Sequence, residues 1–111
     1  MSNNEENLVE NVRRSLRLVV DPELGENVID LGLIYTIEVS GDGIATIEMT
    51  TTTKGCPAAA YLKDAVGSAA WVVPGIHFAD VRMTYEPPWS PEMISGDARR
   101  RLGIEERNGT A

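Results

Sequence analysis

The chain has 111 residues, a common size for one domain, so we expect a single hydrophobic core. With 42% hydrophobic and 24% charged residues, the composition excludes a chain that is disordered throughout. The formal net charge of −7 repels phosphate backbones and argues against nucleic-acid binding. No apolar stretch reaches the ~20 residues of a membrane span, and the N-terminus lacks a signal peptide's basic start. We expect a cytoplasmic protein that binds no membrane, and its single cysteine, Cys56, agrees with a reducing compartment.

The first half of the chain reads as a helix, a loop and a hairpin. Apolar residues at helical spacing predict an amphipathic helix over residues 5–20, ended by Pro22. Residues 21–27 follow as an ordered loop. Apolar and polar residues then alternate over 35–39 and again over 45–49, on either side of a short glycine-rich turn. This pattern predicts two half-buried strands in an antiparallel hairpin.

The second half reads as helix, strand and helix. Proline is favoured at the first position of a helix, so Pro57 begins the second helix and places Cys56 at or near its N-cap. A third strand is expected at about residues 77–85. Ser95 is a candidate cap for the last helix, which ends at Gly103.

The predicted order is therefore α-β-β-α-β-α, an α/β fold of the two-layer α+β kind. The helices are expected to pack on a small mixed three-stranded sheet. No internal repeat or long linker divides the chain, so one domain over residues 5–103 is predicted. The polar ends, residues 1–4 and 104–111, are expected to be flexible termini.

Cys56 is the first candidate for chemistry. A thiol at a helix N-terminus faces unpaired backbone N–H groups and the positive end of the helix dipole, both of which favour the thiolate. Lys54 adds a positive charge two residues earlier. A thiolate is a nucleophile and a soft metal ligand, but free cysteine is also among the most buried residue types. Position alone therefore leaves function and packing open, and one cysteine cannot form a closed four-thiolate site.

The other titratable candidates carry weaker signals. The only histidine, His77, opens a predicted strand, and nothing local aims it at the cysteine to form a catalytic pair. Four carboxylates fall within ten residues, at Asp21, Glu23, Glu26 and Asp30. They could supply hard oxygen ligands, although their spacing matches no calcium loop. The structural alternative is that Asp21 caps a turn and Asp30 braces the loop.

The threonine run before the cysteine and the proline–tryptophan corner near residue 89 each have two interpretations. Thr50 and Thr52 alternate on one strand face, which is good strand chemistry, or their hydroxyls donate hydrogen bonds that tune the thiolate. Pro87-Pro88 could form a rigid corner that places the indole of Trp89 over the core or over the Cys56 loop. A tryptophan that covers the core is the commoner outcome.

Three short motifs follow one another over about residues 8–103. The opening motif is Asp21-Pro22-Glu23-Leu24-Gly25 followed by Asn27-Val28-Ile29-Asp30-Leu31-Gly32-Leu33-Ile34-Tyr35. The middle motif is Met49-Thr50, Thr52 and Gly55-Cys56-Pro57, and the closing motif is Pro87, Trp89, Pro91, Met93, Ser95, Ala98-Arg99 and Leu102-Gly103. Together they resemble the SufT/PaaD-like iron–sulfur cluster assembly family, also called metal–sulfur cluster biosynthetic proteins, which has a eukaryotic branch in cytosolic iron–sulfur targeting.

The resemblance implies an iron–sulfur-assembly-type domain and a role in maturing iron–sulfur proteins. It carries the family's motif cysteine onto Cys56 as the functional residue. If Cys56 is the ligand of an Fe–S cluster or iron, carboxylates such as Glu23 or Asp30, or exogenous thiols, could fill the remaining metal positions. Supporting positions are Asp21, Thr52, Thr53, Gly55, Pro57 and Trp89.

The chain departs from the family pattern at three places. Thr51 stands where an aliphatic residue is usual, which predicts a less apolar strand end. Lys54 stands where proline or a small residue is common, which predicts a freer and more positive cysteine loop. The Cys-rich C-terminal extension of true PaaD proteins is absent, which argues against the role of a phenylacetyl-CoA oxygenase subunit.

Two functions of different classes follow from these residues. The leading hypothesis is a non-enzymatic maturation factor that carries, transfers or helps insert a labile Fe–S cluster or iron, between the Fe–S assembly machinery and client apo-proteins. Since each chain has one cysteine, a bridged cluster would need a homodimer or a partner's cysteine. The alternative is a metal-free adaptor that docks assembly machinery onto clients through its acidic surface or the corner at Trp89. A thiol enzyme is disfavoured, because the chain lacks a resolving cysteine and a convincing base.

Overall fold

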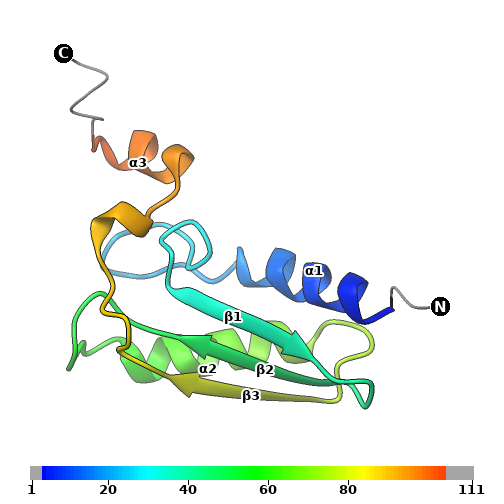
Figure 1. The fold of residues 1–111 in the computed structure, drawn as a ribbon. Helices are drawn as coiled ribbons and strands as arrows, with labels where there is room; N and C mark the ends of the chain where they lie inside the picture. The colour runs from blue at the N-terminus through cyan, green and yellow to red at the C-terminus, as the bar shows by residue number, and fades with distance from the viewer. Residues whose placement is uncertain (1–3, 105–111) are drawn as a thin grey trace.

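The computed structural model describes residues 4–104, and these residues follow the predicted order α-β-β-α-β-α, with a short 3-10 turn before the last helix (Figure 1). Most of the termini expected to be flexible lie outside the described residues. Asn4 is the first residue of the first helix, and the Ile104 N–H donates to the Arg99 carbonyl at 2.8 Å. No helix within residues 4–104 has the length and apolar character needed to cross a bilayer.

The sheet of the described residues has three strands: β1 (Ile34–Val39), β2 (Ile44–Met49) and β3 (Phe78–Met83). The strand order is β1-β2-β3, with β1 antiparallel and β3 parallel to the central strand. This arrangement confirms the predicted mixed sheet. The first two strands form the hairpin that alternation predicted. Parallel strands need a crossover connection, and a helix provides it between β2 and β3.

Three α-helices and one 3-10 turn complete the described chain. They are α1 (Asn4–Leu16), α2 (Ala59–Trp71), η1 (Pro91–Met93) and α3 (Gly96–Leu102). Helices α1 and α2 contact each other and pack on one face of the sheet, while α3 stands away from it beside the loop after α1 (Figure 1). The sheet therefore has one covered and one open face.

The core lies between the sheet and helices α1 and α2. In β2 the residues facing the helices are buried, and those facing the other way, such as Thr46 and Glu48, are only half-buried. This is the period-two pattern of a strand with one face on a core. The fully buried apolar side chains come from every layer and include Val12, Leu16, Leu31, Leu33, Ile47, Met49, Leu62 and Val66.

The first helix ends at Leu16, four residues earlier than predicted, so the sequence-based range of 5–20 is too long. The reason is pairing with the loop that follows. Val20 and Asn27 form an antiparallel bridge, and the Val28 N–H donates to the Val19 carbonyl at 3.0 Å. These bonds need an extended backbone at residues 19–21, which ends the helix before Pro22 can.

The remaining elements differ from the prediction only at their ends. Strand β3 covers Phe78–Met83, shorter than the expected 77–85. Ser95 is the N-cap of α3, and its side chain accepts a hydrogen bond from the Ala98 N–H, as predicted. Gly103 ends the helix with a left-handed φ of 78°, a conformation that glycine adopts at no steric cost.

Candidate functional site

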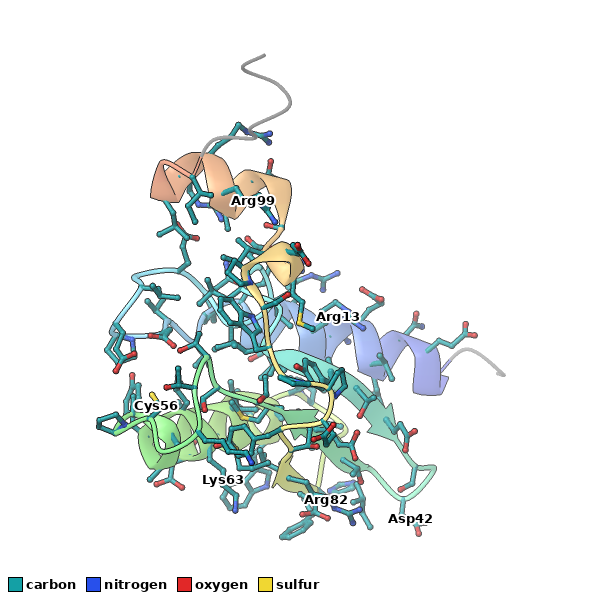
Figure 2. All side chains as sticks on the ribbon, turned by 60° about the vertical axis from the view of Figure 1, so that its left-hand side comes forward. Arg13, Asp42, Cys56, Lys63, Arg82 and Arg99 are labelled. Atoms are coloured by element: carbon teal, nitrogen blue, oxygen red, sulfur yellow. The ribbon has the colours of Figure 1, made fainter. Side chains whose placement is uncertain are left out.

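Cys56 lies in the turn that leads into α2, two residues before the N-cap, which is Ala58 (Figure 2). The sequence placed Cys56 at or near the N-cap, and the structure shows that it lies near the N-cap but not at it. The Cys56 carbonyl accepts from the Ala59 N–H at 3.0 Å, so its backbone helps to start the helix. The side chain is buried, with 7% of the residue exposed. Free cysteine is commonly buried in this way. The Cys56 side chain also touches the acidic loop.

The thiol of Cys56 meets a carboxylate from a distant part of the chain. Its Sγ donates a hydrogen bond to Oε2 of Glu23 at 3.8 Å, across 33 residues of sequence. Glu23 is exposed, so one side of this pair faces solvent. Of the carboxylates proposed as metal ligands, Glu23 is therefore brought to the cysteine. A soft, buried sulfur and the hard oxygen of an exposed carboxylate therefore lie side by side.

Asp21 holds the backbone that presents Glu23. It is buried, and its Oδ1 accepts hydrogen bonds from the N–H groups of Glu23 at 2.7 Å and Leu24 at 3.2 Å. Its own N–H donates to the Glu26 carbonyl, and its carbonyl accepts from the Gly25 N–H. The carboxylate is thus an Asx-type cap of the loop, which is the structural role weighed for it from the sequence.

Asp30 belongs to a different cluster. Its Oδ2 accepts from Asn27 at 3.0 Å and from Arg101 of α3 at 2.9 Å. Arg101 also makes a forked contact with both carboxylate oxygens of Glu26. Hydrogen bonds to Glu26 first, and to Asp30 second, raise the pKa of Arg101 above its usual value. Asp30 therefore braces the loop, as the structural alternative proposed.

His77 does not approach Cys56. It is exposed and lies against Gly43, in the turn between β1 and β2. The cysteine loop lies at the other end of the sheet, where Thr84 N–H donates to the Met49 carbonyl and Tyr85 contacts Thr51. The structure thus separates the histidine from the thiol and disfavours a catalytic pair between them.

The threonine run supports the loop rather than the sulfur. Thr51 is buried, and its hydroxyl donates to the Thr53 carbonyl at 2.7 Å and lies 3.3 Å from the Tyr85 hydroxyl. Thr52 is half-buried and Thr53 exposed. Among the hydrogen bonds of residues 4–104, none joins a threonine hydroxyl to the Cys56 sulfur. Because the buried Thr51 hydroxyl is hydrogen-bonded, a polar residue can stand where an aliphatic one is usual.

The residues flanking Cys56 form an exposed turn. Lys54 is exposed, with its Nζ 5.9 Å from the centre of the Tyr85 ring, so this ring is the partner that the structure gives its ammonium group. Gly55 has a left-handed φ of 74°, and a Cβ there would meet no atom within 4 Å. Pro57 is exposed. The turn can therefore be approached from solvent on the side of Glu23.

Trp89 covers the core rather than the cysteine loop. Its indole packs against the buried cluster, and its Nε1 donates to the Leu31 carbonyl at 2.7 Å. The neighbouring Pro87 carbonyl accepts from the Tyr35 hydroxyl at 2.8 Å. The corner therefore fixes the segment after β3 against the loop before β1.

The donor set at Cys56 is small. Within the described residues, no group of three or more His, Cys, Asp or Glu side chains is placed to hold a metal ion. The thiol and the Glu23 carboxylate supply two donors. Four-coordinate iron held at this pair needs its other ligands from elsewhere.

The sequence interpretation missed the role of Arg101. The sequence has a short basic run, Arg99-Arg100-Arg101, and the structure places it in the last turn of α3, where cations are favourable. The partners of Arg101 lie 71 and 75 residues away. The only sequence signal for this contact is that the chain has one dense basic run and one acidic loop, which carry opposite charges.

Comparison with known proteins agrees with the fold and the motifs. A family model described as "Iron-sulfur cluster assembly protein" matches residues 9–83. The chain is 40% identical to the Fe-S protein maturation auxiliary factor YitW of Bacillus subtilis, over 91% of this chain and 99% of that protein. It is 37% identical to the Fe-S protein maturation auxiliary factor SufT of Staphylococcus aureus, over 78% of this chain and 99% of that protein.

Among solved structures, a domain of unknown function (DUF59) from Bacillus anthracis is similar. It superposes with a TM-score of 0.88 at 33% identity, covering 95% of this chain and all of that one. The match confirms the α-β-β-α-β-α fold, and the family model together with the relatives that span most of the chain confirms the resemblance that the motifs indicated. The chain belongs to the iron–sulfur cluster assembly protein family.

Proposed function

We propose that this protein serves the maturation of iron–sulfur proteins by holding iron, or a labile Fe–S cluster, at Cys56 and passing it to a client. The family and the names of the relatives support the role in maturation. One observation carries the finer proposal, the contact of 3.8 Å between the Cys56 sulfur and the Glu23 carboxylate. Iron is here the cargo of the protein and not a resident cofactor.

The pair has the chemistry that reversible iron binding needs. A cysteine binds metal as the thiolate, so its proton must leave when iron arrives. In the metal-free protein the thiol donates its hydrogen to Glu23, which is therefore placed to take that proton and pass it to water. The freed sulfur becomes a soft ligand of iron, and the carboxylate oxygen beside it a hard one.

The small number of donors suits transfer rather than storage. Two protein ligands leave the other iron positions to sulfide, a small thiol or a cysteine of the partner protein. A client that offers several thiolates then outcompetes this site. Transfer is an exchange of ligands without net oxidation, so we propose that the protein is not an enzyme.

Anaerobic reconstitution with ferrous iron and sulfide tests the proposal. We expect the wild-type chain to gain a visible sulfur-to-iron charge-transfer absorption and bound iron, both lost in Cys56→Ser. Glu23→Gln should keep the sulfur-to-iron absorption but bind iron about tenfold more weakly, because one charged ligand is lost. The matched control is Glu38→Gln, which removes an exposed carboxylate from β1 and should change nothing.

Transfer is measured by adding a cluster-free client and following its own absorption after removal of free iron. The proposal is overturned if wild type and Cys56→Ser gain the same iron and reconstitute the client equally.

The alternative, a metal-free adaptor, is favoured by one observation, namely that the described residues offer no three-donor site. In that case neither protein acquires a chromophore, and client maturation in cells survives Cys56→Ser. Binding to assembly machinery would then be lost on substitution of exposed residues at the corner, such as Pro88→Ala. Trp89 itself is unsuited to this test, because its indole also holds the core.

A further inference from the structure

Strand β3 forms an open edge of the sheet. Within the described residues it pairs with β2 and with no other strand. The N–H groups of Phe78 and Thr84 point to the β2 side, since they donate to the carbonyls of Gly43 and Met49. Because successive residues of a strand alternate, the N–H and C=O groups of 79, 81 and 83 point to the free edge. An unpaired row of this kind is a template for another strand.

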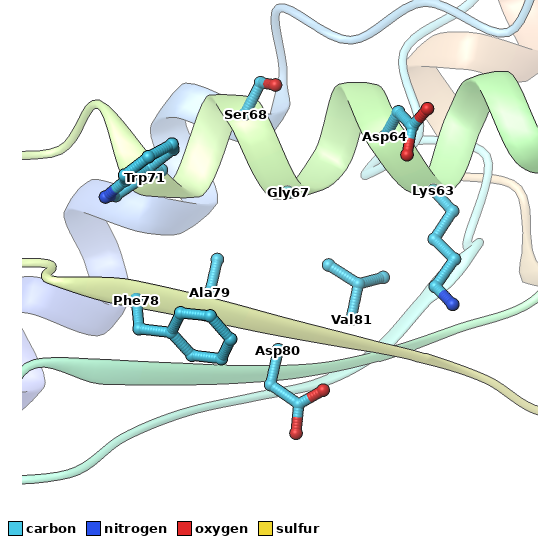
Figure 3. Close-up of a pocket in the computed structure, with 9 residues that line it drawn as sticks. All are labelled: Lys63, Asp64, Gly67, Ser68, Trp71, Phe78, Ala79, Asp80 and Val81. Atoms are coloured by element: carbon cyan, nitrogen blue, oxygen red, sulfur yellow. The ribbon is translucent and has the colours of Figure 1, made fainter.

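A groove runs along the same edge. It has a volume of about 430 Å³ and lies between α2 and β3 (Figure 3). Two of its aromatic residues are exposed, Trp71 on the helix by 63% and Phe78 on the strand by 59%. Lys63 lines the groove at the opposite end of α2 from Trp71 (Figure 3). Exposed aromatic rings beside an open strand edge mark an interaction surface.

We propose that this edge binds a second copy of the chain, with β3 pairing antiparallel to β3 of the partner about a two-fold axis at Val81. The charges of the strand select this occupant and this register. Asp80 and Arg82 both lie on the open face of the sheet, two residues apart, with side chains 37% and 62% exposed. An antiparallel pairing centred on Val81 sets Asp80 of each strand opposite Arg82 of the other.

The backbone hydrogen bonds allow this register, and the charges disfavour the two adjacent registers. With Val81 opposite itself, the residues at 79, 81 and 83 form three pairs that each exchange two hydrogen bonds. A shift by one step either way keeps the hydrogen bonds but sets Asp80 against Asp80, or Arg82 against Arg82. Like charges directly opposite destabilise a strand pair, and opposite charges stabilise it. The ion pair that Arg82 makes within its own strand, at 2.9 Å, is exchanged for the same pair across the axis.

Pairing about this two-fold axis also covers the exposed ring of Trp71. Both copies of α2 lie on the same side of the continuous sheet, and they run in opposite directions. The Trp71 end of one helix therefore lies alongside the Lys63 end of the other. This brings a cation to an aromatic ring across the axis, and the two grooves become one.

The dimer keeps the two cysteines apart. Cys56 lies near the Met83 end of β3, since Thr51 and Lys54 of its loop contact Tyr85. In an antiparallel pair these ends point away from each other. The proposed dimer thus carries two separate cysteine sites and cannot bridge one cluster between its own two sulfurs. The inference does not depend on iron binding at Cys56.

Sedimentation of the full chain from about 1 μM to about 1 mM tests the dimer, which has a small interface and is expected to be weak. Asp80→Arg makes both facing positions positive, and Arg82→Asp makes both negative. Each variant alone should raise the dissociation constant about tenfold or more. An equimolar mixture of the two should restore a dimer, because positive strands then face negative ones. The double variant Asp80→Arg/Arg82→Asp should also dimerise as wild type does.

Arg14→Asp on α1 is the matched control, with the charge change of Arg82→Asp at an exposed position away from the edge. It should leave the dissociation constant unchanged, as should Cys56→Ser. Hydrogen exchange at the N–H groups of 79, 81 and 83 should slow as wild-type concentration rises. A wild-type chain that stays monomeric to 1 mM overturns the proposal and leaves the edge to a client strand. The proposal is also overturned if both single variants dimerise as tightly as wild type. It is overturned as well if the mixture fails to associate although circular dichroism shows that both variants are folded.

Discussion

The buried carboxylate of Asp21 offers the most direct test of how the fold presents the cysteine site. Replacing it with alanine removes the oxygen that accepts from the N–H groups of Glu23 and Leu24 at 2.7 and 3.2 Å. Asp21 is only 2% exposed, so water cannot readily take its place. A hydrogen bond to a charged group contributes about 1.5–3 kcal/mol, and the two bonds here share one oxygen. We expect Asp21→Ala to lower the free energy of unfolding by about 2–3 kcal/mol.

Urea unfolding followed by circular dichroism measures this loss, with an unchanged m-value as the sign that only stability has moved. For 111 residues the melting temperature should fall by about 8–12 °C. Asp21→Asn is the control, because its amide oxygen can occupy the place of the one oxygen that accepts both bonds. It should lose about 1 kcal/mol or less.

The perturbation should also reach the site. Without the Asp21 cap the backbone of Glu23 is no longer fixed, so Asp21→Ala should weaken iron binding at Cys56 while Asp21→Asn keeps it. The reasoning is refuted if Asp21→Ala unfolds within 0.5 kcal/mol of wild type, a margin typical of neutral surface changes. It is equally refuted if the asparagine variant is as unstable as the alanine one.

Three further changes test the packing around the site. Trp89→Phe should lower the free energy of unfolding by about 1–2 kcal/mol, because it leaves the buried Leu31 carbonyl without its donor; the exposed Trp71→Phe should stay within about 0.5 kcal/mol in the same urea titration. Gly32→Ala should lose about 3 kcal/mol or more in thermal melts, since its Cβ would lie 2.6 Å from the Met93 carbonyl oxygen, whereas Gly55→Ala, with a similar φ and open space, should lose about 1–2 kcal/mol. Arg101→Gln should speed hydrogen exchange in residues 26–30, and about 0.5 M salt should shrink the difference from wild type; equal exchange rates would show that α3 does not hold the loop.

The order of the elements was predictable because local patterns determine it. Alternation marked the first two strands, helical spacing marked the helices, and Ser95 and Gly103 marked the ends of the last one. These signals depend on neighbours a few residues away, which the sequence displays directly. The early end of α1 at Leu16 was not predictable, because a bridge between Val20 and Asn27 competes with the helix there.

The cysteine and its family were also evident from the sequence, through motifs that recur in order along the chain. What lies beside Cys56 was not. Two carboxylates of one acidic loop, Glu23 and Asp30, looked equivalent as ligands. In the structure Glu23 contacts the Cys56 thiol and Asp30 contacts Arg101.

Sequence by itself thus determined the order of the elements, which local spacing encodes, and its motifs indicated the family and offered Cys56 as the candidate residue. Tertiary structure decided which distant side chains meet. Cys56 and Glu23 are 33 residues apart, and Asp30 and Arg101 are 71 apart. No short-range pattern encodes such contacts, because they arise only when the packed helices and sheet bring the loops to one side of the core. The open edge of β3, with its paired charges, is likewise a property of strand order and not of the strand's own sequence.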